Sequence, residues 1–234
     1  MNLFYQPGLP DGQLYLDADE SRHCVKVLRK RNGEVIRVTD GKGTFYDAVI
    51  TQADPNRCTL AIQQTETPAP RPYSIHVAVS PTKNADRIEW FVEKAVEIGV
   101  NTITLLNSEN TERTFIKTER LMKVAVSAMK QSLKASLPVI HPLTSLADLI
   151  KNTPAATTRF IAYVDFANTL HLKDAAQPGN DYLVLIGPEG DFSSEEVMLA
   201  SAHGFQKVSL GTERLRTETA AMVATHTLSL INIR

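Results

Sequence analysis

The fold is decided by the stretch Leu183–Met222, which reads LVLIGPEGDFSSEEVMLASAHGFQKVSLGTERLRTETAAM. Its first residues, Leu183–Ile186, form an unbroken apolar run, which is typical of a strand buried on both faces. The sequence GPEG then ends that strand. Ser193 opens a capping box, S-x-x-E, which predicts the start of a helix, and Gly204 predicts its end.

The second half of the stretch repeats this order. Lys207–Leu210 is expected to form a short strand, Gly211 breaks it, and Thr217 is expected to cap a last helix that runs to the C-terminus. The order strand, glycine loop, helix therefore occurs twice. It predicts two polar loops at the same edge of a parallel sheet, which is the edge where open α/β sheets bind ligands.

Upstream of this stretch, strand and helix patterns alternate from Tyr73 onwards. Alternation of this kind predicts an α/β domain whose parallel sheet has helices on both faces. The expected strands are residues 74–79, 102–106 and 159–164, and the expected helices are residues 86–98, 118–137 and 145–151.

The N-terminal part has a different pattern. One helix is expected over residues 19–30, and alternating apolar and polar residues predict half-buried strands at 35–38, 44–50 and 58–63. Short strands with tight turns suggest a small β-barrel. Three prolines at Pro68, Pro70 and Pro72 cannot continue a strand or helix, so we expect a linker there. The expected domains are residues 1–67 and 73–234.

Composition limits the classes of function. The 234 residues carry a formal net charge of −1, so nucleic-acid binding would require a local basic patch. No apolar run approaches the ~20 residues that span a bilayer, and the start of the chain lacks a signal pattern. Two cysteines and six scattered histidines show no metal-binding spacing. We therefore expect a cytoplasmic protein with no metal and no membrane association.

The combination of IGPEG with a Phe-Ser helix start and LG…LRTETA closely resembles the SPOUT class of methyltransferases. Within that class the chain resembles the RsmE family, which methylates N3 of a uridine in 16S ribosomal RNA. DESRHCVKVLR and DRIEWFVEKAVEIGV extend the resemblance over the whole chain. Asp191 stands where the family usually has glycine, and Glu213-Arg214 and Lys134 are further departures. They leave the contacts of the loops open.

The resemblance implies that both glycine loops bind S-adenosylmethionine, chiefly through backbone groups. It also implies a trefoil knot at the C-terminal end, a PUA-like RNA-binding barrel at the N-terminal end, and a homodimer. Ala220, Ala221, Ala224 and Leu228 of the last helix could pack in the dimer or within the chain. The expected cofactor-binding residues are Leu185, Ile186, Gly187, Pro188, Glu189, Gly190, Leu210, Gly211, Leu215 and Thr217.

Two residues next to the second loop are candidates for catalysis. The forked guanidinium of Arg216 suits a uracil oxygen that gains negative charge as the N3 proton leaves. Glu218 is either a helix cap or a general base, and Glu189 is similarly open between bracing its loop and catalysis. The residues alone do not decide between a base and stabilisation of the uracil anion.

The expected RNA-binding surface is a cluster of basic residues on the N-terminal helix and beyond. Charge clusters are often merely solvated, but this one lies in the expected RNA-binding domain. Its residues are Arg22, Lys26, Arg29, Lys30 and Arg31, next to His23 and Arg37, with Lys83 and Arg87 as an extension.

The sequence therefore predicts a methyltransferase that acts on 16S ribosomal RNA in the small ribosomal subunit. Two alternatives remain: a SPOUT ribose 2′-O-methyltransferase, and a non-catalytic RNA-binding assembly factor that kept the fold. The target nucleotide, any general base, the affinities and the choice between free RNA and assembled subunit remain open at this point.

Overall fold

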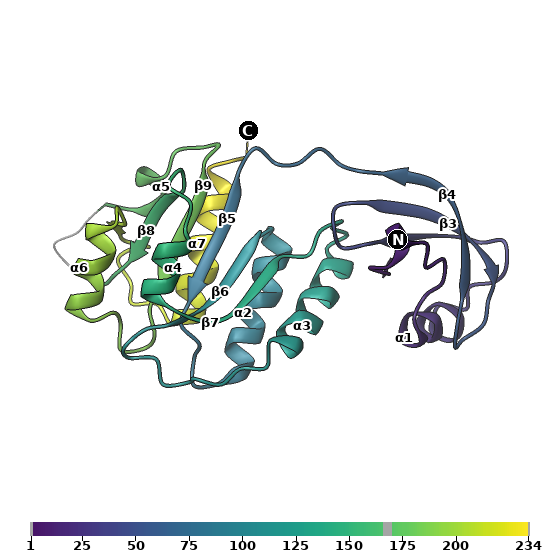
Figure 1. Ribbon diagram of the computed structural model, residues 1–234, viewed down its shortest axis with the longest axis horizontal. Coiled ribbons are helices and arrows are strands. Elements are labelled where there is room, and N and C mark those ends of the chain that lie inside the picture. Colours follow the sequence, from purple (N-terminus) through teal and green to yellow (C-terminus); the bar gives the residue numbers. More distant parts are fainter. Residues whose placement is uncertain (1, 166–169, 234) are drawn as a thin grey trace. The chain divides into compact units, whose positions relative to one another are not determined.

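A computed structural model describes residues 2–165 and 170–233 (Figure 1). The chain forms two compact units. The N-terminal unit comprises the residues up to Pro70 together with Val126–Leu137, and the C-terminal unit comprises Arg71–Ala125 and the chain from Pro138 onwards. Helix α3 (Thr118–Gln131) therefore contributes to both units.

The N-terminal unit is built on a four-stranded sheet in the order β1-β2-β3-β4. Its strands are β1 (Leu3–Tyr5), β2 (Val35–Thr39), β3 (Phe45–Gln52) and β4 (Thr59–Glu66). Only β1 and β2 run parallel. The three longer strands confirm the strand predictions to within a few residues, whereas β1 and a 3₁₀ turn at Leu9–Asp11 were not predicted.

The predicted N-terminal helix is present but shorter and less regular. Helix α1 (Ala18–Arg22) begins at Asp17, whose carboxylate accepts a hydrogen bond from Glu20 N, and continues as a π-helical turn, His23–Val27. Arg29 has a φ of +55°, which a right-handed helix cannot accommodate. The helix therefore ends before the predicted residue 30.

The C-terminal unit contains a six-stranded sheet in the order β10-β8-β9-β5-β6-β7, and every neighbouring pair is parallel. This confirms the predicted parallel sheet. The strands are β5 (Ser74–Val79), β6 (Thr102–Asn107), β7 (Val139–Ser145), β8 (Thr158–Ala162), β9 (Asp181–Ile186) and β10 (Gln206–Val208). The sequence did not predict β7, because the strand contains Pro142 and proline normally argues against a strand. Proline is tolerated on edge strands, and β7 lies at the edge of this sheet.

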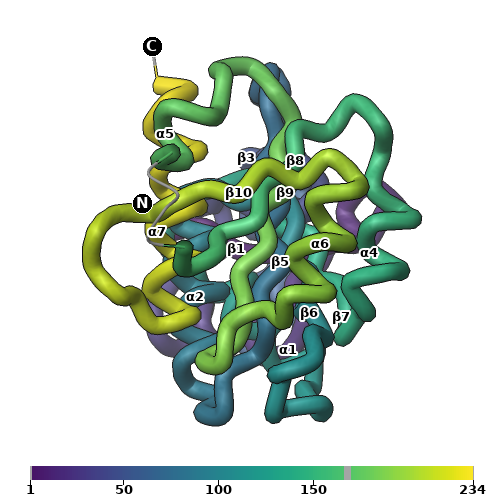
Figure 2. The backbone as a smooth tube through the Cα atoms, turned by 90° about the vertical axis from the view of Figure 1, so that its left-hand side faces the viewer, coloured from purple at the N-terminus to yellow at the C-terminus, as the bar shows by residue number. Residues whose placement is uncertain are grey.

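Helices cover both faces of this sheet (Figure 2). Helix α2 (Ala85–Ile98) packs against α7 (Thr217–Leu230), which also contacts β5 and β9. Helices α4 (Leu146–Asn152) and α6 (Ser194–Ala202) lie on the other face, where their apolar residues share one core with Ala78, Leu183 and Leu185. A one-turn helix, α5 (Leu172–Ala175), packs against α7 and was not predicted.

The predicted helix 118–137 was too long. Helix α3 ends at Gln131, and Leu133 is 47% exposed with a φ of +53°. Residues after Gln131 instead pair with the N-terminal unit, where Thr39 Oγ1 donates to Ala135 O at 2.8 Å. Tertiary contacts therefore overrode a helical pattern that continued in the sequence.

The segment after β10 is also held by a contact that the sequence did not reveal. Ser209 N donates to Leu170 O at 2.8 Å, and Leu172 N donates to Ser209 O at 3.0 Å. These bonds tie the start of the second glycine loop to the segment that leads into α5. The trefoil knot implied by the resemblance stays a prediction.

His76 of β5 makes the stability of the C-terminal unit sensitive to acid. Its Nε2 lies 2.8 Å from Thr104 Oγ1, and burial, together with the nearby His141 ring, lowers the pKa of His76 to about 4. An unfolded histidine titrates near 6.5, so the folded state is fully favoured above that pH and loses stability as the pH falls from about 6.5 to 4. The loss is at most about 1.4 kcal/mol per pH unit.

We therefore expect His76→Asn to flatten the dependence of the free energy of unfolding on pH in this window. Urea titrations between pH 7 and 4 measure it, with His203→Asn at an exposed helix end as the matched control. If His76→Asn and His203→Asn have equal slopes, His76 does not carry this dependence.

Candidate cofactor and RNA site

The two loops that end β5 and β9 leave the sheet side by side. Ser80 N, just after β5, donates to Ile186 O, the last residue of β9, at 3.0 Å. Ser80 and Thr82 are fully buried, and the Ser80 hydroxyl lies 3.1 Å from the Ser108 hydroxyl at the end of β6. The carboxyl ends of three neighbouring strands therefore form one connected polar edge.

The GPEG loop is closed by a short turn in which Asp191 N donates to Pro188 O at 3.0 Å. Gly187 and Pro188 are buried, whereas Glu189 and Gly190 are exposed. A side chain at Gly187 would bring its Cβ within 3.1 Å of the Phe192 ring. This position therefore admits only glycine without a shift of a buried aromatic residue.

Asp191 adopts a φ of +60°, a conformation in which glycine is normally preferred. Its carboxylate accepts hydrogen bonds from Phe192 N at 2.8 Å and from Val164 N at 3.2 Å. Aspartate is one of the few residues that tolerate this conformation, because its short side chain bonds to nearby backbone. Asp191 thus takes the place of glycine and adds a hydrogen bond with Val164, which follows β8.

Asn110 braces the GPEG loop and was missed by the sequence analysis. Its amide Nδ2 donates to Gly190 O at 3.3 Å and to Asp191 O at 3.0 Å. The neighbouring Glu109 N donates to Glu196 Oε1 of the capping box at 2.9 Å. These partners lie about eighty positions apart in the chain, so no local pattern in the sequence indicates them.

The second glycine loop, residues 210–216, is mostly exposed and ends at the start of α7. Gly211 has a φ of +134°, and a Cβ there would meet open space. The prediction that Thr217 caps α7 was wrong. Arg216 is the N-cap residue, and Thr217 is the first helical residue, 5% exposed. Packing of α7 draws Thr217 inward and leaves the capping position to Arg216.

Both loops have backbone groups available for a ligand. Within residues 2–165 and 170–233, the N–H groups of Gly187, Leu210 and Leu215 donate to no recorded acceptor. Backbone donors that are left unpaired in a folded protein are usually satisfied by solvent or a ligand. Contact of these three amides with the adenosyl part of S-adenosylmethionine stays a prediction. The Leu185 side chain lies in the hydrophobic core, so its contact with a cofactor stays a prediction.

Glu218 lies in the first turn of α7, and its side chain is 10% exposed. Its Oε1 is 3.8 Å from Nε of Arg87, at the start of α2, and its Oε2 is buried without a hydrogen-bond partner. Arg216, in contrast, is exposed, and no ion pair is recorded for it among the described residues. The two candidate catalytic residues therefore sit within one helical turn in very different environments.

Lys83 and Arg87 are both held in ion pairs. Lys83 Nζ lies 2.7 Å from Glu112 Oε2, and this hydrogen bond, together with the negative charges of Glu112 and Glu189, raises the pKa of Lys83. Arg87 faces Glu218, as described above. Neither is a freely exposed cation, and their role in RNA binding stays a prediction.

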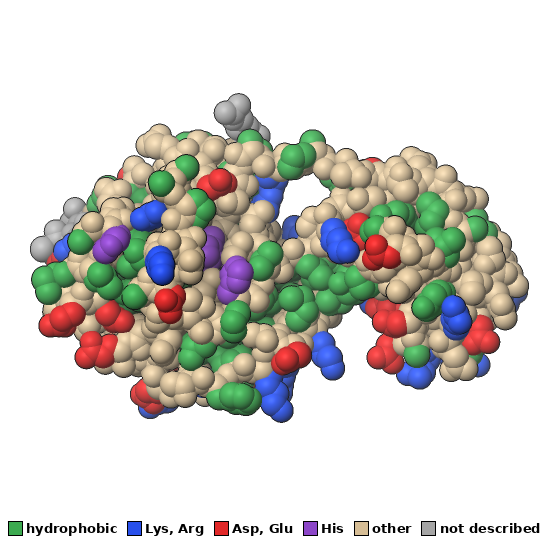
Figure 3. Space-filling model, viewed as in Figure 1, with side chains coloured by type: hydrophobic (Ala, Val, Ile, Leu, Met, Phe, Trp, Pro, Cys, Tyr) green, Lys and Arg blue, Asp and Glu red, His purple; other side chains and the backbone are tan. Residues whose placement is uncertain are grey.

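The basic cluster of the N-terminal unit divides into paired and unpaired cations. Arg22 pairs with Asp19 and Lys30 with Glu34, and Figure 3 shows acidic and basic side chains close together on the visible face of this unit. No ion pair is recorded for Lys26, Arg29 or Arg31 among the residues the structure describes.

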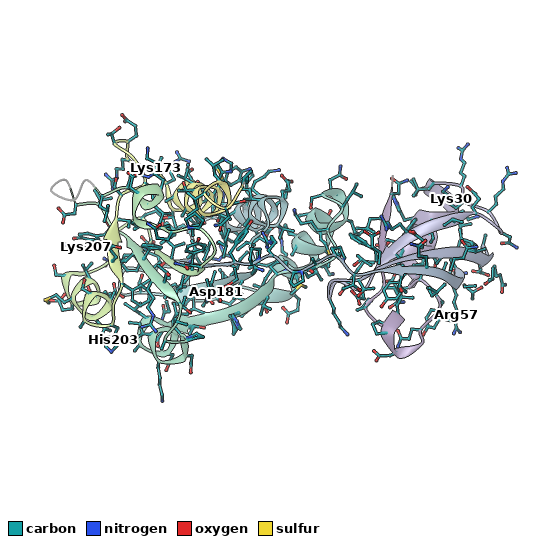
Figure 4. All side chains as sticks on the ribbon, turned by 90° about the horizontal axis from the view of Figure 1, so that it is seen from above. Lys30, Arg57, Lys173, Asp181, His203 and Lys207 are labelled. Atoms are coloured by element: carbon teal, nitrogen blue, oxygen red, sulfur yellow. The ribbon has the colours of Figure 1, made fainter. Side chains whose placement is uncertain are left out.

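Two of the unpaired cations, Arg29 and Arg31, border a shallow depression of about 560 Å³ together with the paired Lys30, whereas Lys26 does not line it. Its lining residues are Val25, Arg29, Lys30, Arg31, Asn32 and Ala53. Figure 4 shows Lys30, which lines the depression, and Arg57, another arginine of this unit, on opposite sides of the unit. Arg57 therefore does not belong to the surface that contains the depression. A phosphate fits such a depression, because two or three cations can contact it at once.

Two kinds of site are absent from the described part of the chain. It holds no group of three or more His, Cys, Asp or Glu side chains that could bind a metal ion. No helix within it is both long and apolar enough to cross a membrane. Cys24 and Cys58 are buried free thiols.

Comparisons with known proteins agree with this geometry. A profile of the RNA methyltransferase domain matches residues 69–229, and a profile of the RNA methyltransferase PUA domain matches residues 16–63. Ribosomal RNA small subunit methyltransferase E of Aquifex aeolicus is 30% identical over 95% of this chain and 96% of that protein. The chain belongs to the ribosomal RNA small subunit methyltransferase E family.

Solved structures of similar chains show the same fold over nearly the full length. A probable rRNA methyltransferase from Porphyromonas gingivalis is 47% identical, with a TM-score of 0.93 over 98% of this chain and 99% of that one. The family member from Neisseria gonorrhoeae, solved bound to S-adenosyl methionine, is 28% identical, with a TM-score of 0.85 over 99% and 98% of the two chains. The predicted α/β methyltransferase fold with a PUA-like N-terminal domain is confirmed.

Proposed function

We propose that this protein transfers a methyl group from S-adenosylmethionine to N3 of a uridine in 16S ribosomal RNA, in the cytoplasm. Membership of the family supports the reaction and the substrate. The observation that carries the proposal is the pair of glycine loops at one sheet edge, where the amides of Gly187, Leu210 and Leu215 have no recorded acceptor among residues 2–165 and 170–233. The bound cofactor supplies an activated methyl group on a sulfonium.

The roles of the protein's own residues follow from their positions. The two loops hold the adenosyl group through backbone donors, and Asn110 keeps the GPEG loop in place. Arg216, exposed at the start of α7, donates to a uracil oxygen as negative charge develops. Most of the acceleration comes from holding the nucleophile in line with the methyl group. No metal is required.

Residues 1–67 serve as the RNA-binding domain and residues 73–234 as the catalytic domain. The active form is a homodimer. Of the α7 residues considered for its interface, Ala221, Ala224 and Leu228 are buried within the single chain, and Ala220 is left partly buried for contact with a partner. Light scattering should give about twice the chain mass of 25.8 kDa. A mass of one chain across a wide concentration range contradicts the dimer.

The unpaired cations of the N-terminal unit should carry most of the RNA affinity. We expect Lys26→Ala, Arg29→Ala and Arg31→Ala together to weaken RNA binding and to flatten its salt dependence by roughly 0.7–0.9 in slope per lost phosphate contact. Binding isotherms at several salt concentrations measure both. Arg22→Ala, which removes a cation already paired with Asp19, is the matched control and should change the slope less. Equal slopes for the triple variant and the wild type would show that these cations are only solvated.

Nucleoside mass spectrometry of small-subunit RNA after incubation with the purified protein and cofactor tests the function. We expect 3-methyluridine. A methyl group on a ribose would identify a 2′-O-methyltransferase instead. Cofactor binding without any methylated product, on both free RNA and assembled subunits, would favour a non-catalytic assembly factor.

A further inference from the structure

One carboxylate oxygen of Glu218 is buried without a hydrogen-bond donor. Oε1 faces Arg87 at 3.8 Å, whereas Oε2 is buried and has no hydrogen-bond partner. A buried carboxylate oxygen without a donor costs free energy, because it has lost its water and gained nothing in return. An unpartnered group of this kind in a folded protein calls for a specific explanation.

Capping of α7 does not explain it. Arg216 occupies the N-cap position, and within the described residues no hydrogen bond joins the Glu218 side chain to a backbone N–H. Arg87 and Glu218, which form the ion pair, instead lie in the first turns of α2 and α7. Asn84 caps α2 by accepting from Asp86 N at 2.9 Å, three positions before Arg87, and α2 packs along α7.

The location indicates what the missing donor is. Glu218 follows the second glycine loop directly, and α7 contacts both β5 and β9, whose carboxyl ends form the polar edge described above. A planar ring with an N–H donor beside carbonyl oxygens supplies the donor that Oε2 lacks, and its oxygens suit an exposed guanidinium such as that of Arg216, two positions earlier in the chain. Uracil presents this pattern at N3, O2 and O4.

We propose that Glu218 Oε2 is the acceptor of the uridine N3 proton, and that Arg87 is a positioning residue that holds Oε1 and leaves Oε2 free to accept from a donor. This inference rests on the proposed function and assigns Arg87 to the catalytic unit rather than to RNA binding. Its side chain is 37% exposed, and its Nε is directed at the carboxylate.

The proton and methyl transfers conserve atoms and charge. The N3–H bond breaks and its proton forms an O–H bond with Oε2 of the Glu218 carboxylate. The N3 electron pair forms a bond to the methyl carbon, and the carbon–sulfur bond breaks with its electrons going to sulfur. The products are a neutral 3-methyluridine, a thioether and a protonated Glu218, which returns its proton to water.

The test compares Glu218→Gln, Arg87→Met and Arg87→Lys with the wild type in single-turnover methylation at saturating cofactor and RNA. We expect Glu218→Gln to lower the rate by about 100-fold or more, which is typical of a lost general base. Its residual rate should rise about tenfold per pH unit, because only uridine already deprotonated by hydroxide can then react. Arg87→Met should lose about 10- to 100-fold in kcat with little change in KM, and Arg87→Lys should recover part of the loss.

Arg120→Met is the matched control. Arg120 of α3 forms an ion pair with Glu89 of α2 at 2.6 Å, so this variant removes a comparable ion pair to the same helix without changing a partner of Glu218. Calorimetry of cofactor binding and thermal melting provide readouts that do not depend on turnover. We expect cofactor affinity to be unchanged in all four variants, because the adenosyl group is held by the backbone of the loops.

The outcomes separate the inference from the function on which it rests. If the wild type makes 3-methyluridine and Glu218→Gln matches its rate, Glu218 is not the proton acceptor. If Arg87→Met lowers the melting temperature but keeps the wild-type methylation rate, as is expected of Arg120→Met, Arg87 has only a structural role. If the wild type makes no methylated uridine, the proposed function fails as well.

Discussion

Replacing Gly187 with valine should abolish binding of S-adenosylmethionine. The Cβ of any side chain here would lie 3.1 Å from two carbons of the Phe192 ring and 3.2 Å from Asp191 Oδ1. The two valine methyl groups must therefore either displace a buried aromatic ring or project toward the ligand, where they block the close approach of the loop backbone. Isothermal calorimetry with the purified variant measures the affinity, and we expect no detectable binding.

The same crowding should also cost some stability. Overpacking of a buried position typically costs about 1–3 kcal/mol, so circular dichroism and thermal melting must first show that Gly187→Val is folded. Gly187→Ala should have an intermediate affinity because it adds only the crowded Cβ. A folded Gly187→Val variant with wild-type affinity would place the cofactor elsewhere.

Replacing Arg216 with alanine should lower turnover by roughly 10²–10³-fold while leaving cofactor affinity nearly unchanged. Removal of one donor that stabilises a developing oxyanion has this typical effect. Arg216 is exposed at the N-cap of α7, so its loss removes no packing and no recorded ion pair among the described residues. Single-turnover methylation at saturating RNA and cofactor measures the chemical step.

Arg214 provides the matched control, because it is an exposed arginine of the same loop. Arg214→Ala removes the same charge and should leave the single-turnover rate within a few fold of the wild type. Arg216→Lys should rescue only part of the loss, since an ammonium lacks the forked donors of a guanidinium. Normal turnover together with weakened cofactor affinity in Arg216→Ala would reverse the role that we give this residue.

Local features of the chain were predictable because short-range forces decide them. The capping box at Ser193 forms as expected, with its hydroxyl accepting from Glu196 N and Glu196 bonding back to Ser193 N. Gly99 ends α2 with a φ of +108°, which favours glycine. The apolar run before GPEG became a fully buried strand, because residues without polar side chains suit a strand covered on both faces.

The candidate site was predictable only in part. The two glycine loops were found because glycines after strands are visible in one stretch of chain. Asn110 was missed, since its bonds to Gly190 and Asp191 depend on how β6 lies relative to β9. The basic cluster was found from the sequence, but only the structure shows that Arg22 and Lys30 pair with Asp19 and Glu34.

The sequence alone therefore determined most of the longer strands and helices, the parallel sheet, the glycine loops and the family. These depend on periodicity, capping and turn chemistry among residues that are near neighbours in the chain. Only the tertiary structure decided that α3 stops at Gln131, that Arg216 rather than Thr217 caps α7, and that Arg87 faces Glu218. Each of these results from packing between elements distant in sequence, where burial and charge pairing outweigh local preference.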